Sequence, residues 1–330
     1  MPSIFPVRVP GDKCARSRNC LLSSDLLCSI SFANYLSGDD MRKAAGVLLN
    51  CLVSVALLSG CAAIDAASVP VAGQQKASLA APEHVMLPAD GRTIDLSIYR
   101  PVSAPLGAIF LSHGAGGSPA RLELLIDRLR DAGFVVLAPL HGDALLIPED
   151  RREDLRTALM TRIGDLQAVS AYSAQAFPDL PYGAVGHSYG SLIGLIGGGA
   201  LQMFDARVPR IEAVASFSSP GIIPGLTEPE GRLETVAVPT LMITGTADTV
   251  EPFALDPQSH ATYFERQPAG DRTLLVINGA SHDFVYGEEA HYDEAMDLLV
   301  TFLRAELLDD AAAATSLASA QTGSGITIRR

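Results

Sequence analysis

A glycine-flanked serine at residues 186–190, Gly-His-Ser-Tyr-Gly, is the feature that most limits how this chain can fold. An apolar run at 181–185 precedes it, and the small and apolar residues 191–196 follow it. Where a strand turns sharply into a helix, the serine sits in a strained turn with its hydroxyl exposed, and the two glycines let the backbones pack closely. The same pattern also arises by chance in a chain with 29 glycines. The interpretation therefore depends on the residues that follow.

An acid and a histidine follow the serine, each shortly after an apolar run. Asp248 comes just after the run 240–244, and His282 comes just after 274–277. Functional groups in α/β sheets gather at the carboxyl ends of strands, so these side chains and Ser188 are expected to meet there. A neutral imidazole accepts the serine's proton, and a carboxylate fixes its tautomer and stabilises its charged form. The sequence predicts a triad of Ser188, Asp248 and His282.

Other histidines and acids fit these roles less well. His187 adjoins Ser188 on the incoming strand and is expected to point away from it. The remaining histidines either precede the serine or do not end a strand: His84, His113, His141, His260 and His291. Glu251 and Asp256 are the alternative acids, whereas Asp283 adjoins the base too closely to orient it. The alternative to a catalytic triad is a non-catalytic fold in which these three polar residues have only a structural role.

A glycine-rich loop, Ser-His-Gly-Ala-Gly-Gly, follows the apolar run 107–111. Acyl-transfer sites hold a developing oxyanion with backbone N–H groups, one from the residue after the nucleophile and one from such a loop. These are expected to be Tyr189 and Ala115; the alternative is a turn that merely leads into a helix. The chain has no G-x-G-x-x-G pattern here, and His141-Gly142-Asp143 lacks a third ligand nearby, so we expect neither a nucleotide cofactor nor a metal.

Strand-like and helical patterns alternate from residue 83 to residue 308. A hairpin is expected within 84–99, and the later strands are continuous apolar runs, which indicates a sheet covered on both faces. Helices are expected at 118–131 and at 289–308, and a charged segment at 149–156 is expected to continue into a long helix that ends at about residue 176. This order predicts one α/β domain at 83–308, with a mostly parallel sheet flanked by helices. Residues 139–162 leave room only for a small cap, and the tail 309–330, rich in Ala, Ser, Thr and Gly, is expected to be disordered.

The residues before this domain have the layout of a secretory signal. A basic start at residue 41 is followed by a short apolar run and by small residues up to Cys61. We therefore interpret 41–60 as a signal peptide and 61–82, rich in Ala, Ser, Gln and Gly, as a flexible linker. The protein then starts at residue 41, and 1–40 receives no interpretation. An ordinary signal peptide or a short membrane anchor is the alternative.

The ending Leu-Ser-Gly-Cys at 58–61 resembles the cleavage box of bacterial lipoproteins. The resemblance implies that Cys61 is lipidated and that the domain is tethered to a membrane only through this lipid anchor. Ala62, rather than Asp, follows the cysteine, which in bacterial lipoproteins implies the outer membrane. The expected location is the bacterial cell envelope, on the periplasmic side of that membrane.

Cysteine usage and charge limit the partners of the domain. All five cysteines lie at or before residue 61, so a thiol nucleophile and a cysteine-bound metal are excluded downstream. The chain carries a net charge of −13; its first 60 residues hold six Lys/Arg and four Asp/Glu, which leaves −15 for the remainder. A domain this acidic is expected to repel nucleic acid and anionic lipid headgroups.

Three motifs resemble those of the α/β-hydrolase superfamily, in particular its dienelactone-hydrolase-like and platelet-activating-factor-acetylhydrolase-like group. They are the Ser-His-Gly-x-Gly-Gly loop at 112–117, the strand Gly-Phe-Val-Val-x-Ala-Pro at 133–139 and the pentapeptide at 186–190. The chain has serine where dienelactone hydrolase has cysteine, so that substrate does not transfer. Polyester hydrolases are also related, but this chain has no tryptophan and no cysteine pair near its end.

The resemblance implies a serine hydrolase that cleaves a small-molecule or lipid-like carboxylic ester through an acyl-enzyme, without a cofactor. A thioesterase, a peptidase or an acyltransferase uses the same triad. Outside the enzymes, the alternative is a surface-tethered binding protein that kept the fold. Neither the acyl-chain length nor the oligomeric state follows from the sequence.

Overall fold

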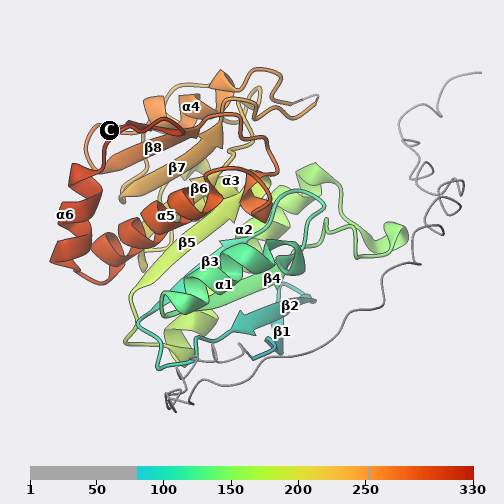
Figure 1. The fold of residues 1–330 in the computed structure, drawn as a ribbon. Coiled ribbons are helices and arrows are strands. Elements are labelled where there is room, and N and C mark those ends of the chain that lie inside the picture. Colours follow the sequence, from blue (N-terminus) through green and yellow to red (C-terminus); the bar gives the residue numbers. More distant parts are fainter. Residues whose placement is uncertain (1–79, 252) are drawn as a thin grey trace, which may run out of the picture. The chain divides into compact units, whose positions relative to one another are not determined.

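The computed structural model describes residues 80–251 and 253–330 (Figure 1). The predicted signal peptide, the lipidation candidate Cys61 and residues 61–79 of the predicted linker lie outside this part of the chain. The described residues form one large sheet with helices on both of its faces (Figure 1).

The sheet in the described residues has nine strands in the order β1-β2-β4-β3-β5-β6-β7-β8-β9. Their bounds are β1 Glu83–Ala89, β2 Arg92–Tyr99, β3 Gly107–Ser112, β4 Phe134–Leu140, β5 Tyr182–His187, β6 Ile211–Phe217, β7 Thr240–Gly245, β8 Arg272–Ile277 and β9 Ile326–Arg329. Neighbours among β3 to β8 pair in parallel, whereas β1, β2 and β9 join antiparallel at the two edges. The predicted mostly parallel α/β sheet is confirmed.

Two apolar cores lie on the two faces of the sheet. The helices that cover them are α1 Glu123–Asp131, α2 Leu155–Ala176, α3 Tyr189–Gly197, α4 Gln258–Glu265, α5 Tyr292–Leu307 and α6 Ala311–Ser319. Successive residues of a strand point to opposite faces. Phe110 therefore joins the core under α2, α3 and α4, and its neighbour Ile109 joins the core under α1 and α5. Figure 1 shows α1 and α5 on the face toward the viewer.

The connection from β4 to α2 is short, as expected for a small cap. It consists of turns and one 3₁₀ helix, η2 (Glu149–Arg151). The long helix begins at Leu155, near the end of the charged segment 149–156, because Asp154 caps it: its carboxylate accepts hydrogen bonds from the backbone N–H groups of Arg156 and Thr157, both at 2.9 Å.

The expectation of a disordered tail at 309–330 is wrong, because this segment forms α6 and β9. Asp310 caps α6 by accepting hydrogen bonds from the N–H groups of Ala312 and Ala313. β9 pairs antiparallel with β8, and Ile326 is buried in the core under α5. Although Ala, Ser, Thr and Gly dominate the segment, two apolar residues in alternation, Ile326 and Ile328, are enough to add an edge strand.

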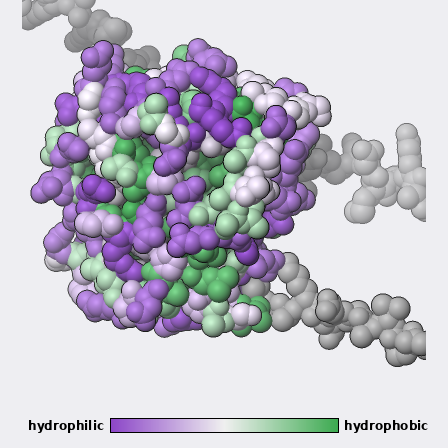
Figure 2. Space-filling view, turned by 90° about the vertical axis from the view of Figure 1, so that its left-hand side faces the viewer, coloured by the Kyte–Doolittle hydropathy of each residue, from purple (hydrophilic) through white to green (hydrophobic). Residues whose placement is uncertain are grey.

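Figure 2 shows a face on which hydrophilic residues surround smaller groups of hydrophobic ones. Of the helices in the described residues, none combines the length and the apolar character needed to cross a bilayer.

A pair of substitutions in β9 tests whether the tail is part of the folded domain. Ile326→Ala should lower the free energy of unfolding by about 2–3 kcal/mol, because it deletes a buried side chain. Thr327→Ala, at the adjacent exposed position, should change it by less than about 0.5 kcal/mol. Urea unfolding followed by circular dichroism measures both, and equal, negligible effects would contradict the described tail.

Candidate active site

Ser188 lies at the sharp turn between β5 and α3. Its backbone angles, φ 53° and ψ −119°, fall in a region that residues other than glycine rarely adopt, at a cost of about 1–3 kcal/mol. The surrounding hydrogen bonds hold it there: Ser188 N donates to Phe217 O at 2.9 Å, and Ser188 O accepts from the N–H and the hydroxyl of Ser191 at 3.0 and 2.7 Å. The sequence pattern therefore marks a strained turn, as expected.

Both glycines of the pentapeptide are required by close packing. A Cβ on Gly190 would overlap the carbonyl group of Ser112 at the end of β3, and a Cβ on Gly186 would overlap the backbone of Gly190. The start of α3 thus lies directly against β3 and β5. Only glycine at these two positions lets the helix begin so close to the sheet.

Asp248 and His282 meet at the carboxyl ends of β7 and β8. His282 Nδ1 lies 2.8 Å from Asp248 Oδ1, and the Thr244 hydroxyl donates to Asp248 Oδ2 at 2.7 Å. The Asp248 side chain is fully buried, whereas that of His282 is 18% exposed. Burial alone would raise the pKa of Asp248, but hydrogen bonds from His260 and His282 hold it well below its usual range. The Asp248 carboxylate is therefore charged and shielded from solvent, whereas a substrate can reach the His282 imidazole.

His187 connects the serine turn to the histidine loop. The two rings of His187 and His282 lie 4.8 Å apart, and His187 Nε2 donates to the carbonyl oxygen of His282 at 3.0 Å. Burial, followed by the nearby His282, lowers the pKa of His187 to about 3, so it is neutral at neutral pH. Ser188 and His282 form no hydrogen bond in the described structure; such contacts often tighten only once substrate is bound.

His260 is a member of this site that its position in the sequence does not predict, because it does not end a strand. It lies on α4, is buried, and places Nε2 3.1 Å from Asp248 Oδ1. Two histidines therefore face one carboxylate. The sequence shows only that His260 lies in the helix after the loop that carries Asp248. Its contact with Asp248 depends on how that helix packs, which the sequence pattern does not show.

Asp248, His260 and His282 are also the described residues that come nearest to a metal-site arrangement, with ligand-type atoms within 4.8 Å of one another. Both imidazoles direct a nitrogen at the same carboxylate oxygen. These atoms are engaged with each other in a hydrogen-bonded cluster, and we assign no metal to them. His141 is also engaged on both ring nitrogens, by Ser112 Oγ at 2.9 Å and Asp165 Oδ2 at 2.7 Å.

The glycine-rich loop after β3 lies against the serine. A Cβ on Gly114 would lie 3.3 Å from the Cβ of Ser188 and 3.0 Å from His187 Nδ1, and the next residue, Ala115, is exposed. Tyr189, the other expected donor, begins α3 directly after Ser188. The structure thus brings the two predicted oxyanion-hole segments to the same serine.

A buried arginine, Arg162 on α2, holds this loop in place. Its Nη1 donates to His113 O at 2.6 Å and its Nη2 to Gly114 O at 3.1 Å. Two hydrogen bonds of 2.8 and 2.9 Å pair it with Asp143, whose Oδ2 accepts from Gly116 N at 3.1 Å. The guanidinium also lies 4.9 Å from the centre of the Tyr189 ring. In the sequence, Asp143 stands out only as a metal-ligand candidate without a third partner, and Arg162 lies inside a helical pattern that gives no sign of this role.

A second Ser-His-Asp set, Ser112, His141 and Asp165, has a structural role. All three side chains are buried, and Arg92 Nη1 lies 2.5 Å from Asp165 Oδ1. Burial raises the pKa of Asp165 to about 6 despite Arg92, and burial holds the pKa of His141 well below its usual range. Since no substrate reaches these groups, they join β2, β3, β4 and α2 rather than perform chemistry.

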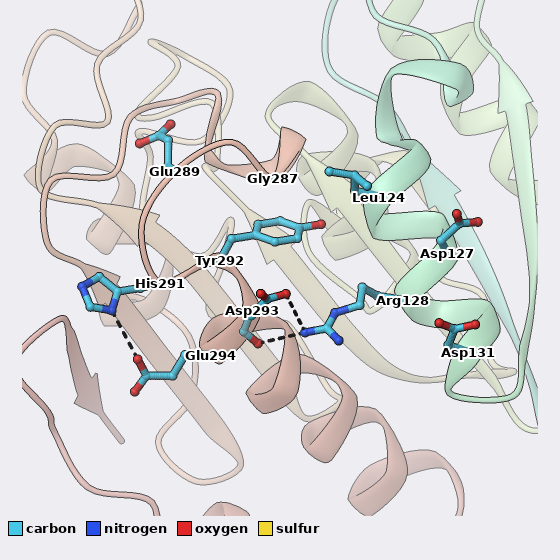
Figure 3. A pocket seen from close by; sticks show the side chains of 10 residues that line it. All are labelled: Leu124, Asp127, Arg128, Asp131, Gly287, Glu289, His291, Tyr292, Asp293 and Glu294. Atoms are coloured by element: carbon cyan, nitrogen blue, oxygen red, sulfur yellow. Dashed lines mark hydrogen bonds and ion pairs between the residues drawn. The ribbon is translucent and has the colours of Figure 1, made fainter. Parts of the chain in front are cut away.

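A pocket of about 550 Å³ lies between α1 and the start of α5 and contains no member of the predicted triad (Figure 3). Its walls are mainly charged. Arg128 Nη2 pairs with Asp293 Oδ1 at 3.0 Å, and His291 Nδ1 lies 3.3 Å from Glu294 Oε2 (Figure 3). In these pairs, charged side chains of the pocket walls bind each other. We assign the pocket no function.

The fold and the position of the serine, acid and histidine after β5, β7 and β8 define an α/β-hydrolase. The model of the PET hydrolase-like family matches residues 94–320, and the chain belongs to that family. Cutinase est1 of Thermobifida alba is 28% identical over 176 residues, which are 53% of this chain and 53% of that protein. Cutinase 1 of Thermobifida cellulosilytica is 28% identical over 178 residues, 53% of this chain and 60% of that protein. The chain spans about half the length of these curated relatives.

Solved structures confirm the fold. An α/β serine hydrolase homologue from Coxiella burnetii aligns with a TM-score of 0.52 at 18% identity, covering 68% of this chain and 98% of that one. A dienelactone hydrolase from Anabaena variabilis aligns with a TM-score of 0.51 at 22% identity, covering 69% and 100%. The expected likeness to dienelactone hydrolase therefore holds for the fold.

Replacing Arg162 tests the role of the buried arginine. If it positions the oxyanion loop, Arg162→Met should lower kcat by about 10²-fold with little change in KM, because the N–H donors move relative to the developing charge. Arg210→Met is the matched control: this arginine also donates to two carbonyl groups and lies over a tyrosine ring, but away from the serine. Ester turnover by folded variants, checked by circular dichroism, measures the effect; an unchanged kcat in folded Arg162→Met would contradict it.

Proposed function

We propose that this protein is a serine hydrolase that cleaves carboxylic esters through an acyl-enzyme. The observation that carries the proposal is the 2.8 Å hydrogen bond between buried Asp248 and accessible His282, beside the strained turn of Ser188. Membership of the PET hydrolase-like family and the similarity to cutinases support the same class of reaction.

The roles follow from the positions of the side chains. With Nδ1 of His282 bound to Asp248, Nε2 is the nitrogen that accepts the proton of Ser188 as the hydroxyl attacks the ester carbonyl. The N–H groups of Ala115 and Tyr189 stabilise the oxyanion that forms. His282 then protonates the leaving alcohol, and the same histidine activates the water that releases the acid.

Substrates with an apolar portion suit the surroundings of this site. Leu145 and Leu146 are exposed on the β4–α2 connection, where Leu145 N donates to Gly116 O in the oxyanion loop. Phe253 and Leu255 are exposed on the loop that carries Asp248. These side chains offer contacts to a lipid-like or polymeric ester, and the short cap leaves the approach open. Thioesters remain the nearest alternative, because the same groups act on them.

A fluorophosphonate probe tests for the nucleophile. The wild-type protein should be labelled, and Ser188→Ala should not be labelled and should lose about 10⁴-fold or more of its ester turnover. Short- and long-chain p-nitrophenyl esters, measured beside thioester and amide substrates, identify the preferred bond. Absence of labelling in folded wild-type protein would favour a binding protein instead.

We also propose that the protein is a lipoprotein of the bacterial cell envelope, anchored through Cys61 and facing the periplasm from the outer membrane. Support comes from the sequence alone: the basic start, the apolar run and the lipoprotein-like box before Cys61. A lipid on this cysteine, with several acyl chains, anchors a protein durably, since each buried methylene contributes about 0.8 kcal/mol.

Metabolic labelling with palmitate tests the anchor. Wild-type protein should incorporate the label and sediment with membranes, whereas Cys61→Ser should do neither. Cys51→Ser, ten residues earlier in the predicted signal peptide, is the control and should be labelled like the wild type. Equal labelling of Cys61→Ser and the wild type would rule out this site.

A further inference from the structure

His260 faces only hydrogen-bond acceptors. Its Nδ1 contacts the backbone carbonyl oxygen of Ser219, and its Nε2 lies 3.0 Å from the backbone carbonyl oxygen of Asp248 and 3.1 Å from Asp248 Oδ1. A neutral imidazole carries one N–H and one lone pair, so it would turn that lone pair toward an oxygen on one side. Two N–H groups satisfy both sides. This set of acceptors favours a ring protonated on both nitrogens.

The electrostatics of the position agree with a charged ring. Burial alone would lower the pKa of His260, but the hydrogen bond and the charge of Asp248, together with the Ser219 carbonyl, raise it above its ordinary value. The Asp248 carboxylate is likewise held in its charged form. A buried charge is tolerated when it is paired and hydrogen-bonded, and each group supplies that condition for the other.

We propose that His260 is a doubly protonated positioning residue that shares the Asp248 carboxylate with His282, and that its positive charge opposes the protonation of His282. The inference rests on the proposed serine-hydrolase function. The centres of the two histidine rings lie 6.0 Å apart. A cation at that distance opposes the arrival of a second positive charge on His282.

Few other charges reach this cluster. On the β5 side, the ring against His282 is His187, which is neutral at neutral pH, and beyond it Tyr286 lies under the guanidinium of Arg121. On the His282 loop, Asp283 is exposed, and Glu289 is occupied by the N–H and hydroxyl of Ser281.

The remaining acids near α4 are exposed. Asp256 accepts a hydrogen bond from Gln258 N at the start of the helix, and Glu251 lies on the acid loop. Among the described residues, Asp248 is thus the carboxylate in contact with both imidazoles. It is the group through which His260 acts on His282.

The pH profile of His260→Gln separates this role from a merely structural one. Glutamine keeps a donor toward Asp248 but carries no charge. We expect the acid limb of kcat/KM to move up by about one pH unit, so that the loss in the variant grows toward about tenfold as the pH falls along this limb, while the variant matches the wild type near pH 8.5. His84→Gln, an exposed histidine paired with Asp95 on β1, is the matched control and should follow the wild-type profile. An equal loss at every pH, or no change, would overturn the proposal.

A second measurement does not depend on activity. In Ser188→Ala protein labelled with ¹⁵N-histidine, NMR should show two protonated ring nitrogens for one histidine at pH 7, and this signal should disappear in Ser188→Ala/His260→Gln. A His260 ring with a single N–H at pH 7 would overturn the inference even if the wild type hydrolyses esters. If the wild type is inactive but the two N–H groups are present, the hydrolase proposal fails while the protonation state stands.

Discussion

The close contact between the start of α3 and the end of β3 is the constraint on which the site depends. Gly190 lies so near the Ser112 carbonyl that no side chain fits between them. This contact fixes where the helix begins and forces Ser188 into its strained backbone conformation. The same contact brings the loop after β3 to the serine. The proposed nucleophile and the proposed oxyanion donors are thus positioned by a single contact between backbones.

Buried charged residues on both sides of Ser188 hold the surrounding loops in place. Arg162 and Asp143 lie under the oxyanion loop, and Asp248 lies between two histidines. Removing one partner of such a pair leaves an uncompensated buried charge, which costs about 3–5 kcal/mol. The loops at the carboxyl edge of the sheet are therefore fixed by electrostatic pairing below the surface, so that their tips are free to meet a substrate.

Local patterns in the sequence were sufficient for the parallel sheet, the serine turn and the meeting of Asp248 with His282. Each depends on residues at the end of an apolar strand. Because the carboxyl ends of parallel strands lie at one edge of the sheet, the order of the strands determines which of these residues come into contact. Arg162 and His260 could not be found in this way, because both lie inside helices and reach the site through packing between elements far apart in sequence. Ile326 was missed for another reason: composition outweighed a short alternation whose partner strand is distant.

Edge strand β9 has a consequence for how the sheet is completed. It covers the open backbone groups of β8, the strand that leads to His282, and it is the last strand in chain order. During synthesis β8 therefore emerges with a bare rim, which is a template for pairing with another chain until β9 arrives.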